Sequence, residues 1–549
     1  MICLVFILLV MAVSDLHAMP ITDGDDNPTA WGQWTVWGDQ RNGFYRNPIV
    51  PADFSDIDCI RVDNDYYAIS STMQFSPGMT ILHSRDLVNW EYIGHAVTDL
   101  TQISPSLSWR EMNRYSRGVW AGTIRHHEGK FYVFFGTPDE GYFMTSAPNP
   151  EGPWEPLTCL LAEDGWDDCT VCWDEKGNGW FFGTCFKDGY KTYRFRMAHD
   201  GSSIDRSSGV VINKGNGREA NKIIYHDGYY YLVFSEYMDG MGRYVMAKRD
   251  KKVTGKFSEK RQLLQPCTEA NEPNQGGIVE GPDGRWYFLT HHGTGDWSGR
   301  IMSLLPVTWT DGWPMMGQSG SDANAPGMMV WQGMVPLSTE HQPHLQRSDD
   351  FDSTKLGLQW QWNYQPKQEN FSLTDRQGWL RLKAFKPIEK HNLLRVGNIL
   401  TQRSFRTSHN EVTIKLEISH VTDGLHAGLA HFSEAYGAIG ITNQHGQNYI
   451  ETVTNGHWET HRIISATIIW LKSVWGLDGQ SRFYFSTDGD TFHPLGTYQL
   501  SWGFYRGDRI GIYCFNEKTE NGHVDVDYLN YSISNISPPD VKVSSRKSP

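Results

Sequence analysis

The sequence predicts an all-β protein in which a five-bladed β-propeller precedes a β-sandwich. Three observations lead to this fold class. A turn followed by an aromatic-rich strand recurs five times, helical periodicity is scarce, and 13% of the 549 residues are aromatic. A chain of this length is expected to hold two or three domains.

The repeated unit is a tight turn containing Gly, Asn or Asp, followed by two to four aromatic residues, which is typical of a β-hairpin. The five aromatic strands begin 49 to 65 residues apart, at Tyr66, Phe131, Trp180, Tyr229 and Trp286. In an all-β sequence, a period of this size indicates propeller blades of about four strands each. We therefore expect five blades within residues 30–340.

A different pattern begins after the polar linkers "SGSDANAPG" and "STEHQPHLQRSDD". In "LGLQWQWNYQP", Trp360 and Trp362 alternate with polar residues, which predicts a strand with one apolar face. Short strands separated by turns continue from there and predict a β-sandwich over residues 347–537, followed by a polar tail at 538–549. The two tryptophans are interpreted as sandwich core, with a sugar-stacking platform as the alternative.

The amino terminus carries an apolar run, "ICLVFILLVMAV", that has the length of a secretory signal core and is too short to span a bilayer. The stretch that follows offers cleavage after Ala18, so residues 1–18 are interpreted as a signal peptide. We expect an exported protein, periplasmic or extracellular, without membrane insertion.

The charge and cysteine content exclude several classes of function. The formal net charge is −14 and no Lys/Arg run offers the basic face that a nucleic acid would need, so such a partner is not expected. Apart from Cys3 in the leader, seven scattered cysteines remain, which is not a disulfide framework. Cys169 and Cys172 form a CxxC without a second pair and do not predict a zinc or redox site.

Three predicted blades open with acidic residues just before an apolar strand, in "DFSDIDCIRV" (53–62), "DGWDDCTVCWD" (164–174) and "NGREANKIIYHDG" (216–228). A propeller gathers its functional groups at one mouth of the central channel, so these acids are expected to meet there. Glu219 lies nine residues before Gly228 and Asp168 lies nine before Gly177, which predicts equivalent positions in two blades.

Two carboxylates across a sugar pocket suit glycosidic cleavage, one as acid and the other as base. A third carboxylate can tune the acid through like-charge repulsion. The alternative is that these acids cap turns or pair with Arg61 and Arg218.

These segments resemble glycoside hydrolase family 43, especially its arabinofuranosidase and β-xylosidase members. The resemblance rests on six phrases in order, from "NPIVPADFSDIDCIRVDNDYYAISSTM" through "PGMTILHSRDLVNWEYIG", "GVWAGTIRHHEGKFYVFF", "APNPEGPWE" and "GRWYFLTHHGTGDWSGRIMSLLPVTWTDGWPMMG" to "FDSTKLGLQWQWNYQPKQENFSLTDRQGWLRL". The last phrase resembles the concanavalin-like sandwich that often follows these catalytic domains, so the second domain is expected to be of that type.

The resemblance implies a general base five residues before Arg61, at Asp56, where Ser55 and Ile57 replace the family's flanking prolines. Asp53 and Asp58 are then turn or wall residues. The implied mechanism is inversion, in which Asp56 takes a proton from the attacking water.

The resemblance implies Glu219 as the general acid, although the usual "EGP" reads "EAN" here. Asp168 is implied as the residue that orients Glu219 and raises its pKa, with Asp167 as the rival for that role. Glu219 must be protonated at working pH, so its pKa is expected to be raised by a half-buried, carboxylate-rich setting.

Further pocket residues follow from the same resemblance. Trp120 matches a position that lines the sugar pocket, with core packing as the alternative. Arg300 matches a position that contacts the bound sugar, and Met73 stands where xylosidases often place an aromatic residue. No cofactor is expected to be required. A structural calcium in the propeller channel is a further implication, with His291 or His292 as its ligand and a hydrogen-bonded structural histidine as the alternative.

The expected function is an exo-acting glycosidase that releases terminal α-L-arabinofuranosyl residues, and β-D-xylosyl residues as a second activity, from hemicellulose. Its partners would be fragments of arabinoxylan, arabinan or xyloglucan. A β-D-xylosidase acting on xylo-oligosaccharides, a non-catalytic carbohydrate-binding propeller and a retaining enzyme acting on fructosides are the alternatives.

Overall fold

The computed structural model describes residues 36–238, 242–266, 273–293, 295–319, 325–337 and 343–534. The predicted signal peptide and the polar tail lie outside the described residues. Within them, strands dominate, and the helices are four short 3-10 turns: η1 (Leu100–Gln102), η2 (Pro105–Leu107), η3 (Gln368–Asn370) and η4 (Leu393–Arg395). None of these described helices has the length and apolar character needed to cross a bilayer. The six cysteines of the described chain are all free thiols.

Five antiparallel sheets follow one another along the first part of the chain. Their strands, sheet by sheet, are β4 (Asp58–Val62), β5 (Asp65–Ser70), β7 (Gly78–Ser84) and β8 (Glu91–Val97); β9 (Gly122–His127), β10 (Lys130–Thr137), β11 (Gly141–Ala147) and β12 (Thr158–Leu161); β13 (Trp166–Trp173), β14 (Gly179–Cys185), β15 (Lys191–Met197) and β16 (Ile204–Lys214); β17 (Glu219–His226), β18 (Tyr229–Met238), β19 (Gly242–Asp250) and β20 (Arg261–Leu264); β21 (Gln275–Glu280), β22 (Trp286–His292), β23 (Ile301–Thr310) and β24 (Trp313–Met316). The fifth sheet also receives β3 (Val50–Asp53), which pairs with β23.

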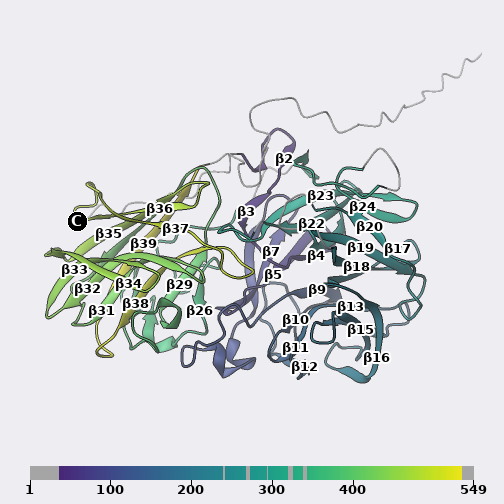
Figure 1. The fold of residues 1–549 in the computed structure, drawn as a ribbon, viewed down its shortest axis with the longest axis horizontal. Coiled ribbons are helices and arrows are strands. Elements are labelled where there is room, and N and C mark those ends of the chain that lie inside the picture. The colour runs from purple at the N-terminus through teal and green to yellow at the C-terminus, as the bar shows by residue number, and fades with distance from the viewer. Residues whose placement is uncertain are drawn as a thin grey trace, which may run out of the picture.

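The five sheets close into a ring. The first strand of each sheet contacts the first strand of the next, and β21 contacts β4. The predicted five-bladed propeller is therefore confirmed (Figure 1). Each of the five predicted aromatic hairpins is the turn between the first and second strand of one blade.

The second part of the chain folds into two antiparallel sheets. In spatial order, the first sheet contains β34 (His457–Ile464), β33 (Gln447–Thr454), β32 (Tyr436–Gln444), β31 (Leu425–Phe432), β38 (Arg509–Asn516), β29 (Ile399–Arg403) and β26 (Gln361–Asn363). The second contains β27 (Phe371–Ser372), β28 (Leu380–Lys383), β39 (His523–Ile533), β30 (Asn410–Glu417), β35 (Ile468–Trp475), β36 (Gln480–Ser486) and β37 (His493–Gln499). Trp360 and Trp362 are buried in the core, as predicted.

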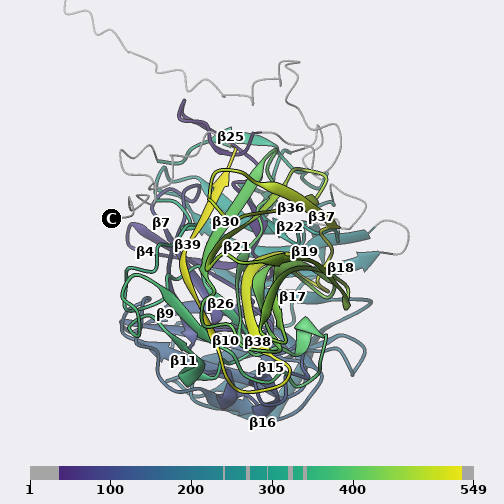
Figure 2. The same cartoon turned by 90° about the vertical axis from the view of Figure 1, so that its left-hand side faces the viewer.

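The two domains share structure rather than merely touching. The short propeller segment β6 (Phe75–Ser76) is the last strand of the first sandwich sheet, where Ser76 pairs with Trp362. One hydrophobic cluster contains Phe54 of the propeller together with Leu400 and Ile510 of the sandwich. When the sandwich faces the viewer, it lies in front of the propeller (Figure 2). A small sheet of β1 (Gly38–Asp39), β2 (Phe44–Arg46) and β25 (Gln332–Met334) ties the start of the propeller to the segment after it.

Candidate active site

The innermost strands of blades three and four begin with the same irregularity. In β13, pairing stops after Asp167, opposite Thr184, and resumes at Thr170, opposite Phe182. In β17, pairing stops after Glu219, opposite Ser235, and resumes at Lys222, opposite Val233. Each strand therefore holds one extra residue, a β-bulge, which bends the strand and re-aims its side chains.

The bulges correct one prediction from the sequence. Glu219 is in register with Asp167, whereas Asp168 is in register with Ala220, and both bulged residues have positive φ angles of 51° and 59°. The predicted equivalence of Glu219 and Asp168 was therefore wrong. Their equal spacing from a hairpin glycine arises because the loop after β13 spans 174–178, whereas the loop after β17 spans only 227–228.

The two bulges are joined to each other through Asp168. Its carboxyl accepts a hydrogen bond from the backbone N–H of Ala220, the residue that follows Glu219. The Nε2 of Gln275 in β21 donates to Asp168 Oδ1 over 3.1 Å, and Asn221 donates to the Asp168 carbonyl over 3.2 Å. Asp168, only 7% exposed, is thus held directly beside Glu219.

Glu219 opens β17 with a side chain that keeps 30% of its exposure. Its Oε1 lies 2.5 Å from Arg243 Nη2, an ion pair that reaches across β18 to β19. Burial in the pocket raises the pKa of Glu219 to about 7; Arg243 opposes this rise and Asp168 reinforces it. A carboxyl with this pKa retains its proton at a pH where an ordinary carboxyl has lost it.

Asp167 and Asp168 both sit in the same carboxylate-rich setting. Burial raises the pKa of Asp168, and Asp56 reinforces this while Ala220 opposes it through its hydrogen bond. Burial also holds the pKa of Asp167 well above its ordinary value, with Asp168 and Asp56 adding to the effect. Asp167 Oδ1 has no hydrogen-bond partner among the described residues, so only Asp168 is tied to the acid strand.

Asp56 lies in the turn between β3 and β4 and has a φ of 57°. Three groups fix it from different elements: its N–H donates to His291 Nδ1 (2.7 Å), Ser71 Oγ donates to Oδ2 (2.6 Å) and Arg300 Nη1 donates to Oδ1 (2.8 Å). A left-handed Asp at a functional mouth is a conformation that its surroundings must enforce. Hydrogen bonds therefore hold Asp56 in place between Ser55 and Ile57.

The two neighbouring aspartates have structural contacts. Asp53 Oδ1 accepts from Ser55 Oγ and from the backbone N–H of Arg300. Asp58 Oδ2 accepts from Thr123 Oγ1 and from Arg125 Nη1, which ties blade one to blade two. Burial opposes ionisation of Asp58, but Lys222 and Arg125 together lower its pKa.

The proposed pairing of the acids with Arg61 and Arg218 does not occur. Arg61 donates to the carbonyl of Asp63, and Arg218 forms an ion pair with Glu236. The arginines that contact Asp56 and Glu219 are instead Arg300 and Arg243.

The two histidines of β22 face different surroundings, as neighbours on a strand must. His291 is fully buried beside Asp56, and burial holds its pKa well below the ordinary value, so the ring is neutral. His292 shares a hydrogen bond with Ser303 and lies edge-on to Trp331. Of the two predicted calcium ligands, His291 is therefore the one beside the acids, and a neutral imidazole is the form that binds metal.

The remaining predicted pocket residues fall into two groups. Trp120 is half-buried, and Arg300 keeps 20% of its side-chain exposure while bonded to Asp56. Met73 is only 2% exposed, and its backbone forms a bridge with Val119 next to Trp120. Met73 therefore leaves little of its own surface to a ligand.

The sandwich domain reaches the same place through Tyr505. Its carbonyl accepts from Ser55 Oγ over 3.0 Å, and its ring lies edge-on to Trp120 with 6.0 Å between centroids. The Arg300 guanidinium stands 5.5 Å from the centre of the Tyr505 ring. Tyr505 is 41% exposed with a φ of 69°, so a strained, partly open loop of the second domain lines the mouth beside Asp56.

Four of these contact residues were missed from the sequence: Ser71, Arg243, Gln275 and Tyr505. Ser71 and Gln275 are ordinary polar residues within or beside predicted strands, and nothing in their sequence context indicates a functional role. Tyr505 lies 450 residues from Ser55, in the sandwich, which the sequence predicts as a domain distinct from the propeller. Arg243 had a usable signal, because it lies in the strand paired with the acid hairpin.

Comparison with known proteins identifies the architecture. The model of glycosyl hydrolases family 43 matches residues 45–314, and a β-xylosidase of Formosa agariphila is 30% identical over 554 residues, covering 91% of this chain and 92% of that protein. The chain belongs to glycoside hydrolase family 43. The predicted family is confirmed, and as a member the protein is a glycosidase.

Three further comparisons agree with this family. The β-xylosidase C-terminal concanavalin A-like domain matches residues 348–532, which confirms the predicted type of sandwich. A non-reducing end α-L-arabinofuranosidase of Bacteroides ovatus is 30% identical over 375 residues, covering 62% of this chain and 65% of that protein. A crystal structure of a family 43 protein from Bacillus licheniformis superposes with a TM-score of 0.77 at 26% identity, covering 89% of this chain and all of that one.

Proposed function

We propose that this family 43 glycosidase acts at chain ends, releasing terminal α-L-arabinofuranosyl residues, and β-D-xylosyl residues as a second activity, from hemicellulose. The observation that carries the proposal is the pairing of two carboxyls with different partners around one mouth. Asp56 is bonded to Arg300, and Glu219 is flanked by Asp168 and has a pKa of about 7. Two carboxyls with different environments suit base and acid roles.

In this proposal Asp56 accepts a proton from a water as the water oxygen bonds to the anomeric carbon. The bond between that carbon and the leaving oxygen breaks, and Glu219 gives its proton to the leaving oxygen. Asp168 is the positioning residue, because it is bonded to the amide that follows Glu219. The released sugar then has the opposite anomeric configuration.

The wall at Tyr505 supports action at chain ends. Tyr505, Trp120 and Arg300 contact one another on the side of Asp56, so the mouth is bounded there by both domains. A pocket closed on one side accepts a terminal sugar more readily than the middle of a chain. Fragments of arabinoxylan, arabinan or xyloglucan are the proposed substrates.

A β-D-xylosidase acting on xylo-oligosaccharides is the second candidate. It is favoured by the match of the sandwich to the β-xylosidase C-terminal domain and by the relative of Formosa agariphila, which is named a β-xylosidase. Arabinofuranose is favoured by Met73, which stands at the position where xylosidases often have an aromatic residue.

We further propose that the protein is exported, on the strength of its apolar leader, and that it needs no cofactor for the acid–base chemistry. The imidazole of His291 is the candidate ligand if a calcium ion occupies the channel, where the ion would act as structural support. Treatment with EDTA is then expected to lower thermal stability more than it lowers the initial rate at 25 °C.

The test compares aryl α-L-arabinofuranosides with aryl β-D-xylosides, together with NMR of the first-formed anomer. We expect turnover of both, with inversion, and a loss of about 10³-fold or more in Asp56→Asn. Asp490→Asn, an exposed change on the sandwich, is the matched control and should keep full activity. A retained anomer, or undiminished activity in Asp56→Asn, contradicts the proposed mechanism.

A further inference from the structure

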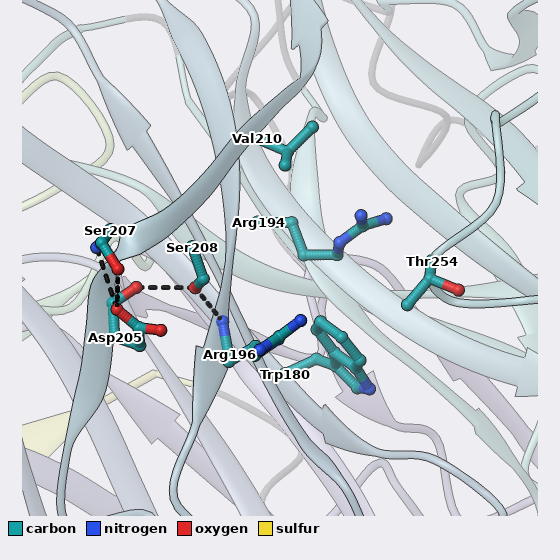
Figure 3. A pocket seen from close by; sticks show the side chains of 8 residues that line it. All are labelled: Trp180, Arg194, Arg196, Asp205, Ser207, Ser208, Val210 and Thr254. Carbon is teal, nitrogen blue, oxygen red and sulfur yellow. Dashed lines mark hydrogen bonds between the residues drawn. The ribbon is translucent and has the colours of Figure 1, made fainter.

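A second pocket lies on the outer part of blade three, away from the acids. It has a volume of about 470 Å³ and is lined by β14, by the two outer strands β15 and β16, and by Thr254 of the segment between β19 and β20. Trp180, Arg194 and Arg196 extend into it from β14 and β15 (Figure 3). A pocket of this size is within the range that holds small ligands.

Arg194 is the unusual member of this pocket. It is only 9% exposed, its Nη1 donates to the carbonyl of Val253 over 2.8 Å, and its guanidinium stands 5.4 Å from the centre of the Trp180 ring. The partners that the described part of the chain gives this guanidinium, a carbonyl and an indole ring, carry no negative charge. Burying an unpaired charge is costly, so the site is built for an anion that the protein itself does not supply.

Arg196 adds a second positive group at the same place. It is exposed and lies opposite Asp205 in the pairing of β15 with β16, where its charge interacts with that carboxylate. The Asp205 carboxylate accepts its hydrogen bonds from the N–H and hydroxyl of Ser207, at 3.0 and 2.6 Å. Arg194 and Arg196 thus place two positive charges beside a single carboxylate, in a chain whose formal net charge is −14.

We propose that this pocket binds a carboxylate-bearing sugar, a hexuronic acid residue of an acidic polysaccharide. The planar guanidinium groups match a carboxylate in two-point geometry. The Trp180 ring and the Val210 side chain give an apolar surface for the C–H face of a pyranose, and Asp205, Ser208 and Thr254 give polar groups for its hydroxyls.

The same lining disfavours inorganic phosphate as the occupant. Asp205 lies at the edge of the pocket and would repel a doubly charged ion, whereas it can accept a hydrogen bond from a sugar hydroxyl. A phosphate also has no apolar face to match Trp180 and Val210. The site is distinct from the three acids, and binding there requires no turnover.

The experiment is a calorimetric titration of the full-length protein with sodium D-glucuronate, D-glucose and inorganic phosphate in parallel. We expect glucuronate to bind, glucose to bind at least tenfold more weakly, and phosphate to bind more weakly than glucuronate. Arg196→Gln should weaken glucuronate binding about tenfold or more, because a charged hydrogen-bonding group is lost. Arg482→Gln, an exposed change in β36, is the control with the same loss of charge and should bind as the unchanged protein does.

Arg194→Gln is the second variant, paired with a thermal melt to show that the buried change leaves the protein folded. Glucuronate binding that survives in both pocket variants overturns the proposal, as does equal affinity for glucose or phosphate. Hydrolysis of aryl glycosides should be unchanged in Arg196→Gln. Failure of glucuronate binding would leave that hydrolysis intact, and failure of hydrolysis would leave the binding result intact.

Discussion

Blades three and four begin with the same β-bulge but carry their acidic residues at different positions in it. In blade four, the last paired position holds Glu219, partly exposed to the mouth, and the bulged position holds Ala220. In blade three, the last paired position holds Asp167, whose Oδ1 is buried, and the bulged position holds Asp168. Glu219 and Asp168 therefore differ by one residue in their position along the two strands.

The difference teaches how a repeated unit acquires two different acids. The bulged residue of blade four offers its N–H, and the bulged residue of blade three offers the carboxyl that accepts it. Were both acids at the same register position, this bond between strands would be lost. The bulge brings the two strand starts together, and the residue at each position decides which strand donates the hydrogen bond and which accepts it.

Glu219→Gln is expected to have the largest effect among these two strands. The rate on substrates with a poor leaving group should fall about 10²–10⁴-fold, because no group remains to protonate the leaving oxygen. Aryl substrates with an acidic phenol should lose much less. Steady-state kinetics on both substrate types checks this, and an equal loss on the two contradicts the role of Glu219 as acid.

Asp168→Asn is expected next, with a rate loss of about 10–10²-fold. Removing its charge removes a repulsion that raises the pKa of Glu219, so the alkaline limb of the kcat/KM profile should move to lower pH. Asp167→Asn is the internal comparison and should move that limb less, because Asp167 lacks the bond to Ala220. A larger displacement in Asp167→Asn would reverse the assignment of the two aspartates.

Arg243→Gln should move the same limb in the other direction. The Arg243 guanidinium opposes the rise in the pKa of Glu219, so its loss raises that pKa above about 7 and extends activity to higher pH. Arg482→Gln serves as the matched control for loss of a positive charge. A limb that stays in place or moves to lower pH would show that Arg243 does not set the acidity of Glu219.

Ala220→Gly is expected to have the smallest effect. Ala220 holds a φ of 59°, which glycine adopts without strain, so the free energy of unfolding should rise by about 1 kcal/mol or less. The N–H that bonds Asp168 is retained, so the pH profile should be unchanged. Thermal melts and the pH profile together check this, and a destabilised protein would mean that the Ala220 methyl group packs favourably.

Much of this arrangement could be predicted from sequence, because it depends on local patterns. The five hairpins, the buried Trp360 and Trp362 and the acidic starts of three blades all follow from turn residues and alternation. The register of Asp168 could not be predicted, because counting from a glycine assumes equal hairpin loops. A bulge adds one residue without changing the composition of the strand, so it leaves no mark in the sequence.

The long-range contacts could not be predicted for a different reason. Tyr505 meets Ser55, Trp120 and Arg300 only because the sandwich is seated on the propeller. Nothing in the sequence around Tyr505 distinguishes it from the other aromatic residues of the chain. Arg243 faces Glu219 through the pairing of three successive strands, which becomes visible only once their register is known.

The strand β6 makes the sandwich depend on the propeller for the last strand of one of its sheets. Ser76 pairs with Trp362, so the propeller completes a sheet that belongs to the sandwich. A gene fragment ending after the fifth blade would encode a protein with an unpaired strand and an uncovered apolar surface, the features that lead to aggregation. We therefore expect that a domain exchange gives a folded protein only when both domains are transferred together.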